Sequence, residues 1–235
     1  NLDRVDYESA SKRVEGFLEA YDNNVIVTPN AEIIMTAQKN SELAKALNNA
    51  DLCLPDGIGV VLASKILGKP LVERTTGYDF MIKILSMANE RSLSVFLLGG
   101  KPGIAKKAAE NVKKTYEDIK IAGVHHGYFQ QSDEEEVITK INNSSPDILL
   151  VAMGAPRQEL FMMKNIKKLK FRVAMGVGGS LDVLSGTVSR APVFMQRTGL
   201  EWLYRLIAQP SRYKRMGTLP VFLIEILAHR FSRKN

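Results

Sequence analysis

The chain has 235 residues, of which 45% are hydrophobic and 24% are charged. This composition excludes a disordered chain, and this length predicts one large domain or one domain with an appendage. Cys53 is the single cysteine, which excludes an intrachain disulfide, and the three histidines have no ligand pair at zinc spacing. We therefore expect neither a metal nor a cofactor.

Charge and hydropathy give a first indication of location and partners. The N-terminal segment lacks the basic start and the apolar run of a secretory signal, so we expect a cytosolic protein. No stretch reaches about 18 apolar residues without a charge, which argues against a membrane span. Residues 195–235 carry eight Lys or Arg against two Glu and so hold +6 of the net charge of +7. Such a tail predicts an anionic partner: a membrane surface, a phosphate group or nucleic acid.

Short apolar runs alternate along the chain with longer helical patterns. The predicted strands span residues 25–28, 51–54, 94–98, 120–124, 147–153 and 172–177. The predicted helices span residues 31–47, 58–67, 77–90, 104–116, 133–142 and 157–169. Runs such as DILLVAMG are continuously apolar, as strands buried on both faces of a parallel sheet are. The predicted class is α/β, with a Rossmann-like, mostly parallel, doubly wound sheet.

The pattern changes after residue 189. An apolar and aromatic helix is predicted over residues 191–208, followed by a basic loop and an apolar helix over residues 221–231. We therefore divide the chain into an α/β domain of residues 1–194 and a basic, apolar helical appendage of residues 195–235. The apolar residues of the last helix could insert into lipid or pack on protein, and the sequence leaves both open.

Glycine turns mark the predicted ligand-binding edge of the sheet, because ligands of such folds bind outside the carboxyl ends of the strands. The amides of Gly99 and Gly100 could hold a phosphate at the start of a helix, although tight turns also need glycine for steric reasons alone. Gly178 and Gly179 leave the same alternatives open. Asp182 beside them adds an acceptor suited to a ribose or uracil group.

Polar residues at the same edge are also open to two interpretations. Asp56 follows a strand, between a proline and a glycine, and taken alone it fits a helix cap better than a catalytic group. His125 and His126 are adjacent, so at most one of them faces a ligand. Arg157 and Gln158 could be ordinary residues of a first helical turn. The motif Asp-x-Asp does not occur, so cations and backbone amides would have to stabilise any diphosphate leaving group.

Six motifs stand in order along the chain: TPNAEI, LPDGIGV, RTTGYDF, LLGGKPG, GAPRQE and GVGGSLDVLSG, followed by RAPVFMQRTGLEWLYRLIAQPSRYKR. With this order and spacing, residues 25–215 resemble the TagA-type N-acetylmannosaminyltransferases of the WecG/TagA/CpsF family. The resemblance implies an inverting, metal-independent transfer of N-acetylmannosamine from UDP-ManNAc to the 4-hydroxyl of GlcNAc on undecaprenyl diphosphate, in wall teichoic acid assembly. It also implies a possible homodimer and a peripheral contact with the inner face of the cell membrane.

The resemblance also assigns roles to single residues. It implies that Asp56 is the catalytic base, which reverses the preference for a cap. Further catalytic roles fall on a threonine, a glutamine and tail arginines: Thr28, Gln158, Arg205, Arg212 and Arg215. Substrate and nucleotide contacts are expected from Asn30, Arg74, Gly99, Gly100, His125, Gly127, Tyr128, Gly178, Gly179 and Asp182.

Three alternatives remain beside this interpretation. Transfer of the uronic acid form of the same sugar uses most of the same motifs. A nicotinamide-dependent dehydrogenase fits the fold, although the glycine spacing is wrong for one. The basic tail would suit a nucleic-acid-binding module, but few aromatic residues accompany its charges, so we expect no nucleic acid.

Overall fold

The computed structural model describes residues 2–20, 22–72, 74–208, 210 and 217–232. Its centre is a six-stranded sheet in the order β2-β1-β6-β5-β3-β4, and every pair of neighbouring strands is parallel. The strands are β1 (Asn24–Val27), β2 (Leu52–Cys53), β3 (Ser94–Gly99), β4 (Lys120–His125), β5 (Ile148–Ala152) and β6 (Val173–Gly176). The predicted α/β class with a parallel sheet is confirmed.

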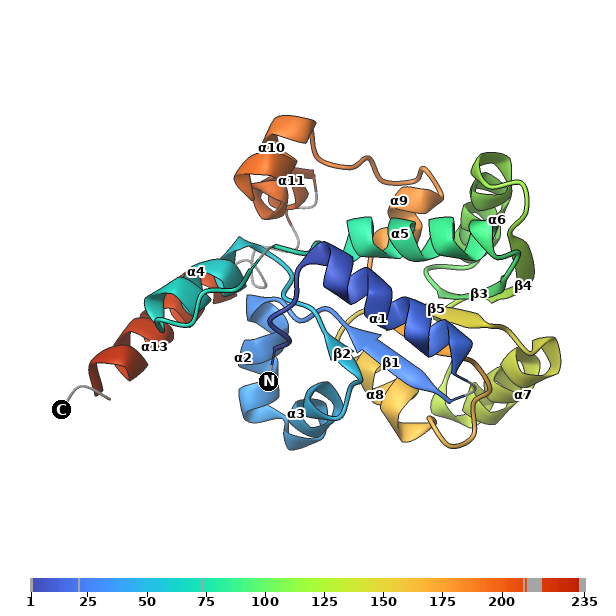
Figure 1. Cartoon of the computed structure of the whole chain (residues 1–235), viewed down its shortest axis with the longest axis horizontal. Coiled ribbons are helices and arrows are strands. Elements are labelled where there is room, and N and C mark those ends of the chain that lie inside the picture. The colour runs from blue at the N-terminus through green and yellow to red at the C-terminus, as the bar shows by residue number, and fades with distance from the viewer. Residues whose placement is uncertain (1, 21, 73, 209, 211–216, 233–235) are drawn as a thin grey trace.

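Helices cover both faces of this sheet (Figure 1). One core cluster joins the sheet to α1 (Tyr7–Glu19), α5 (Gly77–Glu90), α6 (Ile104–Thr115) and α9 (Ser180–Leu184). The opposite cluster joins it to α2 (Ala31–Lys39), α3 (Ser41–Asn48), α7 (Glu134–Ser144) and α8 (Arg157–Lys164). Every residue of β5 is buried, because this strand has helices on both sides. A short 3₁₀ turn, η1 (Gln131–Asp133), leads into α7.

Two predicted helices are each split in the structure. The helix predicted over residues 31–47 breaks at Asn40, whose side chain caps α3 by accepting a hydrogen bond from the Leu43 amide at 3.0 Å. The helix predicted over residues 191–208 breaks at Gly199, where φ is +76°, into α10 (Val193–Thr198) and α11 (Glu201–Ala208). A side chain at Gly199 would bring its Cβ to 2.9 Å from Ile58, so glycine also allows close packing here.

The helices that follow β1, β6, β5, β3 and β4 alternate between the two faces of the sheet. The helix after β1, α2, lies on one face, whereas the helix after β6, α9, lies on the other. In open α/β sheets ligands bind at such a reversal, outside the carboxyl ends of the strands. The reversal between β1 and β6 is therefore one of the places where this topology favours a ligand site.

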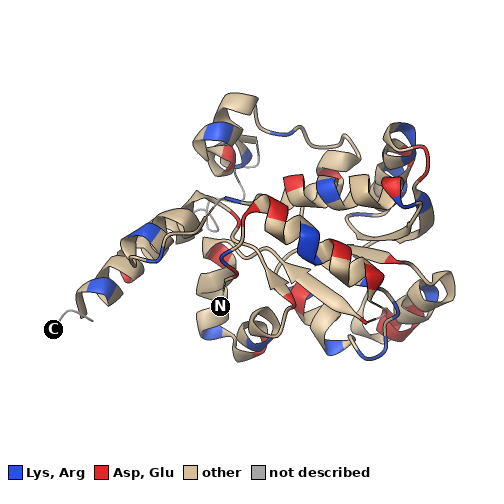
Figure 2. Cartoon of the chain, viewed as in Figure 1, with Lys and Arg blue, Asp and Glu red and all other residues tan. Residues whose placement is uncertain are grey.

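The last helix, α13 (Thr218–Ser232), packs beside α2 and α4 (Ile58–Ile66). Phe222 is its buried anchor and joins Ala31, Met35 and Ala63 in a small separate core. In Figure 1, α4 and α13 lie side by side and project from the body. Figure 2 shows charges of both signs over the body and mostly Lys and Arg on these two helices. Among the described residues, every helix is too short or too polar to cross a bilayer.

Phe222→Ala should release α13 without unfolding the sheet, because Phe222 belongs to neither of the two large core clusters. We expect faster amide hydrogen exchange throughout α13 and little change in the melting temperature of the body. Phe231→Ala is the matched control, since that ring is 65% exposed on the same helix. Equal exchange in α13 of the two variants would contradict this account of its anchor.

Candidate active site

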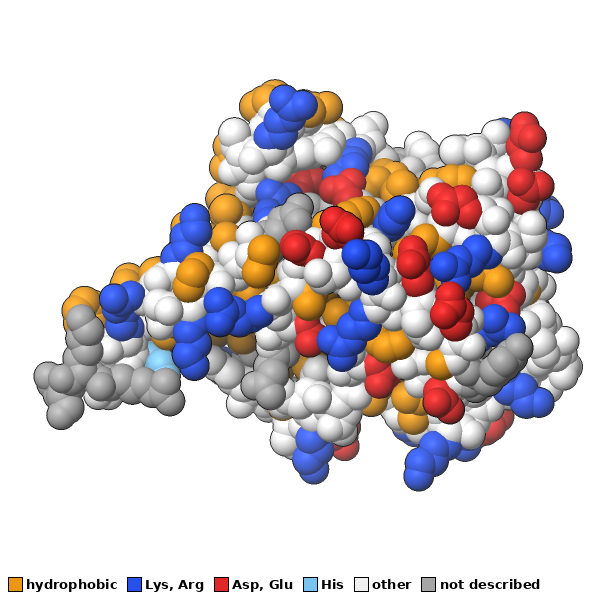
Figure 3. Space-filling view, viewed as in Figure 1, with side chains coloured by type: hydrophobic (Ala, Val, Ile, Leu, Met, Phe, Trp, Pro, Cys, Tyr) orange, Lys and Arg blue, Asp and Glu red, His pale blue; other side chains and the backbone are white. Residues whose placement is uncertain are grey.

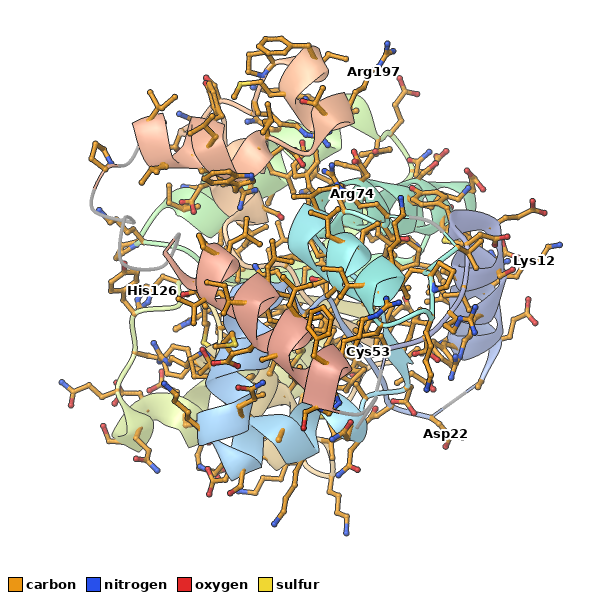
Figure 4. The ribbon with its side chains drawn as sticks, turned by 90° about the vertical axis from the view of Figure 1, so that its left-hand side faces the viewer. Lys12, Asp22, Cys53, Arg74, His126 and Arg197 are labelled. Atoms are coloured by element: carbon orange, nitrogen blue, oxygen red, sulfur yellow. The ribbon has the colours of Figure 1, made fainter. Side chains whose placement is uncertain are left out.

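The carboxyl ends of β1 and β2 open onto a cavity of about 150 Å³, called here the Asp56 pocket. Four of the predicted site residues line it together, although they are far apart in sequence: Asn30, Asp56, Arg74 and Arg205. Side chains from the starts of α2, α4 and α5, from α11 and from Leu219 on α13 complete the wall. Figure 4 shows Arg74 on the side of the molecule where α4 and α13 lie.

Asp56 does not cap the helix that follows it. The N-cap of α4 is Gly57, which has φ +85° and makes no side-chain capping bond. The carboxylate of Asp56 instead accepts a hydrogen bond from the backbone of Gly77, the first residue of α5. A Cβ atom at Gly77 would lie 2.9 Å from Thr28 Oγ1 and 3.5 Å from Asp56 Oδ2. Glycine at this position therefore lets the start of α5 approach both predicted catalytic side chains.

Burial raises the pKa of Asp56 to about 6. The positive charges of Arg205 and Arg74 and the hydrogen bond from Gly77 oppose this rise, whereas the negative charge of Glu201 adds to it. Desolvation thus exceeds the attraction of two arginines. The group is ionised at neutral pH and still basic enough to accept a proton, which is the balance that general-base catalysis requires.

An ion network fastens the appendage to this pocket. Glu201 on α11 accepts a hydrogen bond of 2.5 Å from Arg74, and its other oxygen lies 3.7 Å from Arg190 Nε. Arg190 also donates to Asp79 Oδ2 at 2.8 Å. Because residues four apart share one face of a helix, the fixed Glu201 also directs Arg205 toward the pocket. Sequence reasoning missed Glu201; its only signal was an acidic residue inside a basic tail.

A second cavity, of about 40 Å³, lies at the carboxyl end of β6. Gly179 and Asp182 line it, as the sequence predicts for a nucleotide-binding turn, together with residues of α11. Tyr78, Glu201 and Arg205 line both this cavity and the Asp56 pocket. The two cavities are therefore adjacent parts of one site along α11.

Gln158 lies between two loops rather than in either cavity. It is 4% exposed, and its Oε1 atom accepts hydrogen bonds from the amides of Gly154 and Gly178, at 3.2 and 3.0 Å. Its Nε2 atom donates to Glu159 Oε1 at 2.8 Å. These bonds tie the loop after β5 to the loop after β6. In this structure Gln158 positions the backbone at Gly178.

The turns after β3 and β4 form a third group. Gly99 has φ +143°, and a Cβ atom there would lie 2.3 Å from the carbonyl oxygen of Ala152, which favours the steric reason for glycine. The amide of Gly100 donates to that same oxygen at 3.0 Å, and the amide of Gly127 donates to the Gly100 carbonyl at 2.9 Å. None of these residues lines the two cavities described above.

The remaining predicted residues are placed as follows. His125 Nδ1 lies 2.7 Å from the carbonyl oxygen of His126, and burial lowers the pKa of His125. Tyr128 is 65% exposed. Arg212 and Arg215 lie outside the described residues. Within the described part of the chain, no three His, Cys, Asp or Glu side chains are grouped so that they could hold a metal ion.

A comparison with known proteins defines the class to which this fold and site belong. The model of the glycosyl transferase WecG/TagA/CpsF family matches residues 1–235, and the chain belongs to this family. The family resemblance stated from the motifs is confirmed. A glycosyltransferase is therefore favoured over a dehydrogenase or a nucleic-acid-binding module.

Three relatives carry the same enzyme name, N-acetylglucosaminyldiphosphoundecaprenol N-acetyl-beta-D-mannosaminyltransferase. The one from Bacillus spizizenii is 42% identical over 231 residues, which cover 97% of this chain and 89% of the relative. The one from Bacillus subtilis is 39% identical over 89% of this chain and 81% of the relative. The one from Staphylococcus aureus is 35% identical over 88% of this chain and 81% of the relative.

The raised pKa of Asp56 predicts a specific pH dependence of stability. The folded carboxyl group holds its proton up to about pH 6, whereas the unfolded one releases it near 3.8. Wild type therefore loses stability relative to Asp56→Asn as the pH rises between these values. We expect the melting temperature of Asp56→Asn minus that of wild type to increase between about pH 4 and pH 7.

Calorimetric melting curves of both proteins across this range measure the difference. Asp133→Asn is the control, because hydrogen bonds from Gln130 and Ser132 lower the pKa of that exposed carboxyl group, so it stays ionised across this range. The difference in melting temperature between Asp133→Asn and wild type should therefore stay nearly constant between about pH 4 and pH 7. A pH-independent difference for Asp56→Asn would refute the raised pKa.

Proposed function

We propose that this chain transfers N-acetylmannosamine from UDP-ManNAc to the 4-hydroxyl group of the GlcNAc carried by undecaprenyl diphosphate. The names of the relatives support the transferred sugar and the acceptor. One structural observation carries the chemistry: the desolvated carboxylate of Asp56 lies in a pocket with two arginines, at the ligand-binding edge of the sheet.

The reaction is a single displacement with inversion at the anomeric carbon. The acceptor oxygen forms a bond to C1 of the sugar as the bond from C1 to the UDP oxygen breaks, and the acceptor proton passes to Asp56. The transfer to Asp56 occurs late, because a carboxylate with a pKa of about 6 cannot deprotonate a free alcohol beforehand. The two electrons of the broken bond leave with UDP.

Arg205 stabilises the departing diphosphate. It lines both cavities, so it can face the nucleotide at the β6 turn and Asp56 at the β2 turn. Preorganised donors of this kind typically contribute about 10² to 10³ in rate. Asp182 would accept a hydrogen bond from the nucleoside, and Thr28 and Asn30 would orient the sugars. Arg212 and Arg215 remain candidates for further contacts with the diphosphate.

The division into residues 1–194 and 195–235 also has a functional meaning in this proposal. The first unit supplies Asp56 and the nucleotide turn, and the second supplies Glu201, Arg205 and Leu219 to the same pocket. The appendage would thus complete the active site.

The appendage would also hold the enzyme on the anionic inner face of the cell membrane. The outer side of α13 exposes large apolar side chains: Val221, Ile224, Leu227 and Phe231. Figure 3 shows hydrophobic side chains beside Lys and Arg along this projecting part of the molecule. Exposed apolar groups with basic neighbours suit the boundary between lipid headgroups and acyl chains. A second copy of the chain is the other partner that could cover this surface.

Transfer of labelled sugar from UDP-ManNAc to a soluble GlcNAc-diphosphate lipid analogue tests the function. We expect activity with and without EDTA, and at least about a 100-fold loss of turnover in Asp56→Asn. UDP binding should persist in that variant and can be followed by the fluorescence of Trp202, the single tryptophan, which lines the pocket. If the enzyme transfers sugar only from the uronic acid donor, that donor and not UDP-ManNAc is the substrate. If Asp56→Asn turns over at a near-normal rate, Asp56 is not the catalytic base.

Flotation with liposomes tests the membrane contact. Wild type should float with vesicles that contain phosphatidylglycerol and detach at high salt, whereas the double variant Ile224→Glu/Phe231→Glu should remain in solution. Tyr128→Glu is the control, because it places one glutamate at another exposed aromatic residue, outside the appendage. If the double variant is monomeric where wild type is a dimer, and both float equally, the exposed face of α13 is a contact between two copies of the chain.

A further inference from the structure

A larger cavity than either part of the active site lies further along α13. It has a volume of about 590 Å³ and runs between the N-terminal segment, α2, α3, α4 and α13. Most of its wall is apolar, and its large apolar side chains include Ile34, Leu47, Val60, Leu67, Phe222 and Ile226. Arg4 and Lys69 are the charged residues on this wall within the described chain. We call this cavity the α13 groove.

The α13 groove continues the wall of the Asp56 pocket along three helices. On α4, Gly59 lines the pocket and Ala63, one turn later, lines the groove. On α13, Leu219 lines the pocket, whereas Phe222 and Ile226 line the groove. The same change occurs along α2, which begins at the pocket and ends at the groove. Each helix therefore presents one continuous face to both cavities.

The chemistry of the groove suits a hydrocarbon chain attached to a phosphate. Its volume lies within the range of about 300 to 1,000 Å³ that ligand sites occupy. Burial raises the pKa of the Cys53 thiol to about 12, so that part of the wall is uncharged. The charged residues of its described wall are both cations, which attract rather than repel an anionic lipid. Figure 4 looks onto α13 and shows Cys53 and Arg74, one from the groove and one from the pocket.

We propose that the α13 groove binds the isoprenoid chain of the lipid-linked acceptor, beginning at the end next to the diphosphate. This inference rests on the proposed function, which places the polar end of the acceptor in the Asp56 pocket. The attached chain has to leave that pocket, and the apolar face shared by α4 and α13 gives it a surface on which to be buried. The groove would then favour acceptors that carry an isoprenoid chain over acceptors with a short or straight one.

Binding of farnesyl phosphate, a soluble isoprenoid monophosphate without a sugar, tests the groove directly. Ala37→Trp places an indole ring in the groove, and Lys39→Trp is the matched control on the exposed side of the same helix. By native mass spectrometry of the whole chain, wild type and the control should bind farnesyl phosphate, and Ala37→Trp at least about 10-fold more weakly. The loss of burial of only two methylene groups suffices for this factor.

A second filling variant, Ala44→Trp on α3, enters the same groove from another wall and should also weaken binding. Absence of binding by wild type, or equal binding by both filling variants and the control, would overturn the proposal. Equal binding of dodecyl phosphate, which has a straight chain of twelve carbons, would assign the groove to lipid chains in general.

Transfer kinetics then separate this inference from the proposed function. With an isoprenoid acceptor, Ala37→Trp should raise KM at least about 10-fold and leave kcat unchanged, whereas a short alkyl acceptor should give wild-type values. Equal losses with both acceptors would contradict the groove. Suppose that neither wild type nor the variants transfer sugar, while wild type still binds farnesyl phosphate and Ala37→Trp binds it more weakly. The proposed function is then wrong, and the assignment of the groove to an isoprenoid chain is retained.

Discussion

The site depends on one close approach, between the start of α5 and the ends of β1 and β2. There the backbone of Gly77 approaches the carboxylate of Asp56 and the hydroxyl of Thr28 so closely that a Cβ atom would crowd the Thr28 hydroxyl at 2.9 Å. This approach buries Asp56 at the positive end of a helix, which partly offsets the desolvation of its charge. A carboxylate with a pKa of about 6 is the result of burial working against a helix end and two arginines.

The same electrostatic balance explains why the appendage belongs to the site. Arg74 comes from the body and Arg205 from α11, and both lower the pKa of Asp56. Glu201 pairs with Arg74 across the boundary between the two units. Glu201 raises the pKa of Asp56, which the two arginines lower, yet its ion pair with Arg74 also fixes α11, the helix that carries Arg205. The proton affinity of the predicted base is thus set jointly by two segments that are 127 residues apart.

Local patterns in the sequence predict most of the fold, and they fail where a single residue interrupts a pattern. Apolar runs locate all six strands, most clearly β5, because a strand buried on both faces has no polar positions. Asn40 and Gly199 break helices that periodicity alone extends, since a cap and a positive φ are local events inside an otherwise helical pattern. The amphipathic helix α1 was not predicted.

Long-range contacts explain what could not be predicted about the site. Nothing near Glu201 in the sequence indicates that its partner is Arg74. Gln158 belongs to a family motif, yet the two hydrogen bonds that its Oε1 atom accepts connect loops that only the sheet brings together. Asp56 resembles a cap until the structure shows Gly57 in that position. Motif and spacing therefore identify residues of the site, whereas the partners and burial that determine their chemistry follow from the fold.

The apolar helix α13 borders the Asp56 pocket, the α13 groove and an exposed surface. The helix is apolar around most of its circumference, and such a helix requires cover on more than one side. α2 and α4 cover one side through Phe222, and the opposite side remains exposed at Ile224 and Phe231. The first turn of α13 reaches the Asp56 pocket through Leu219. A single helix thus borders a pocket that holds charged side chains, an apolar groove and an exposed apolar surface. A substrate with a charged sugar-bearing end and a hydrocarbon tail has the same sequence of polarities, so in the proposed function α13 would align it with the carboxylate of Asp56.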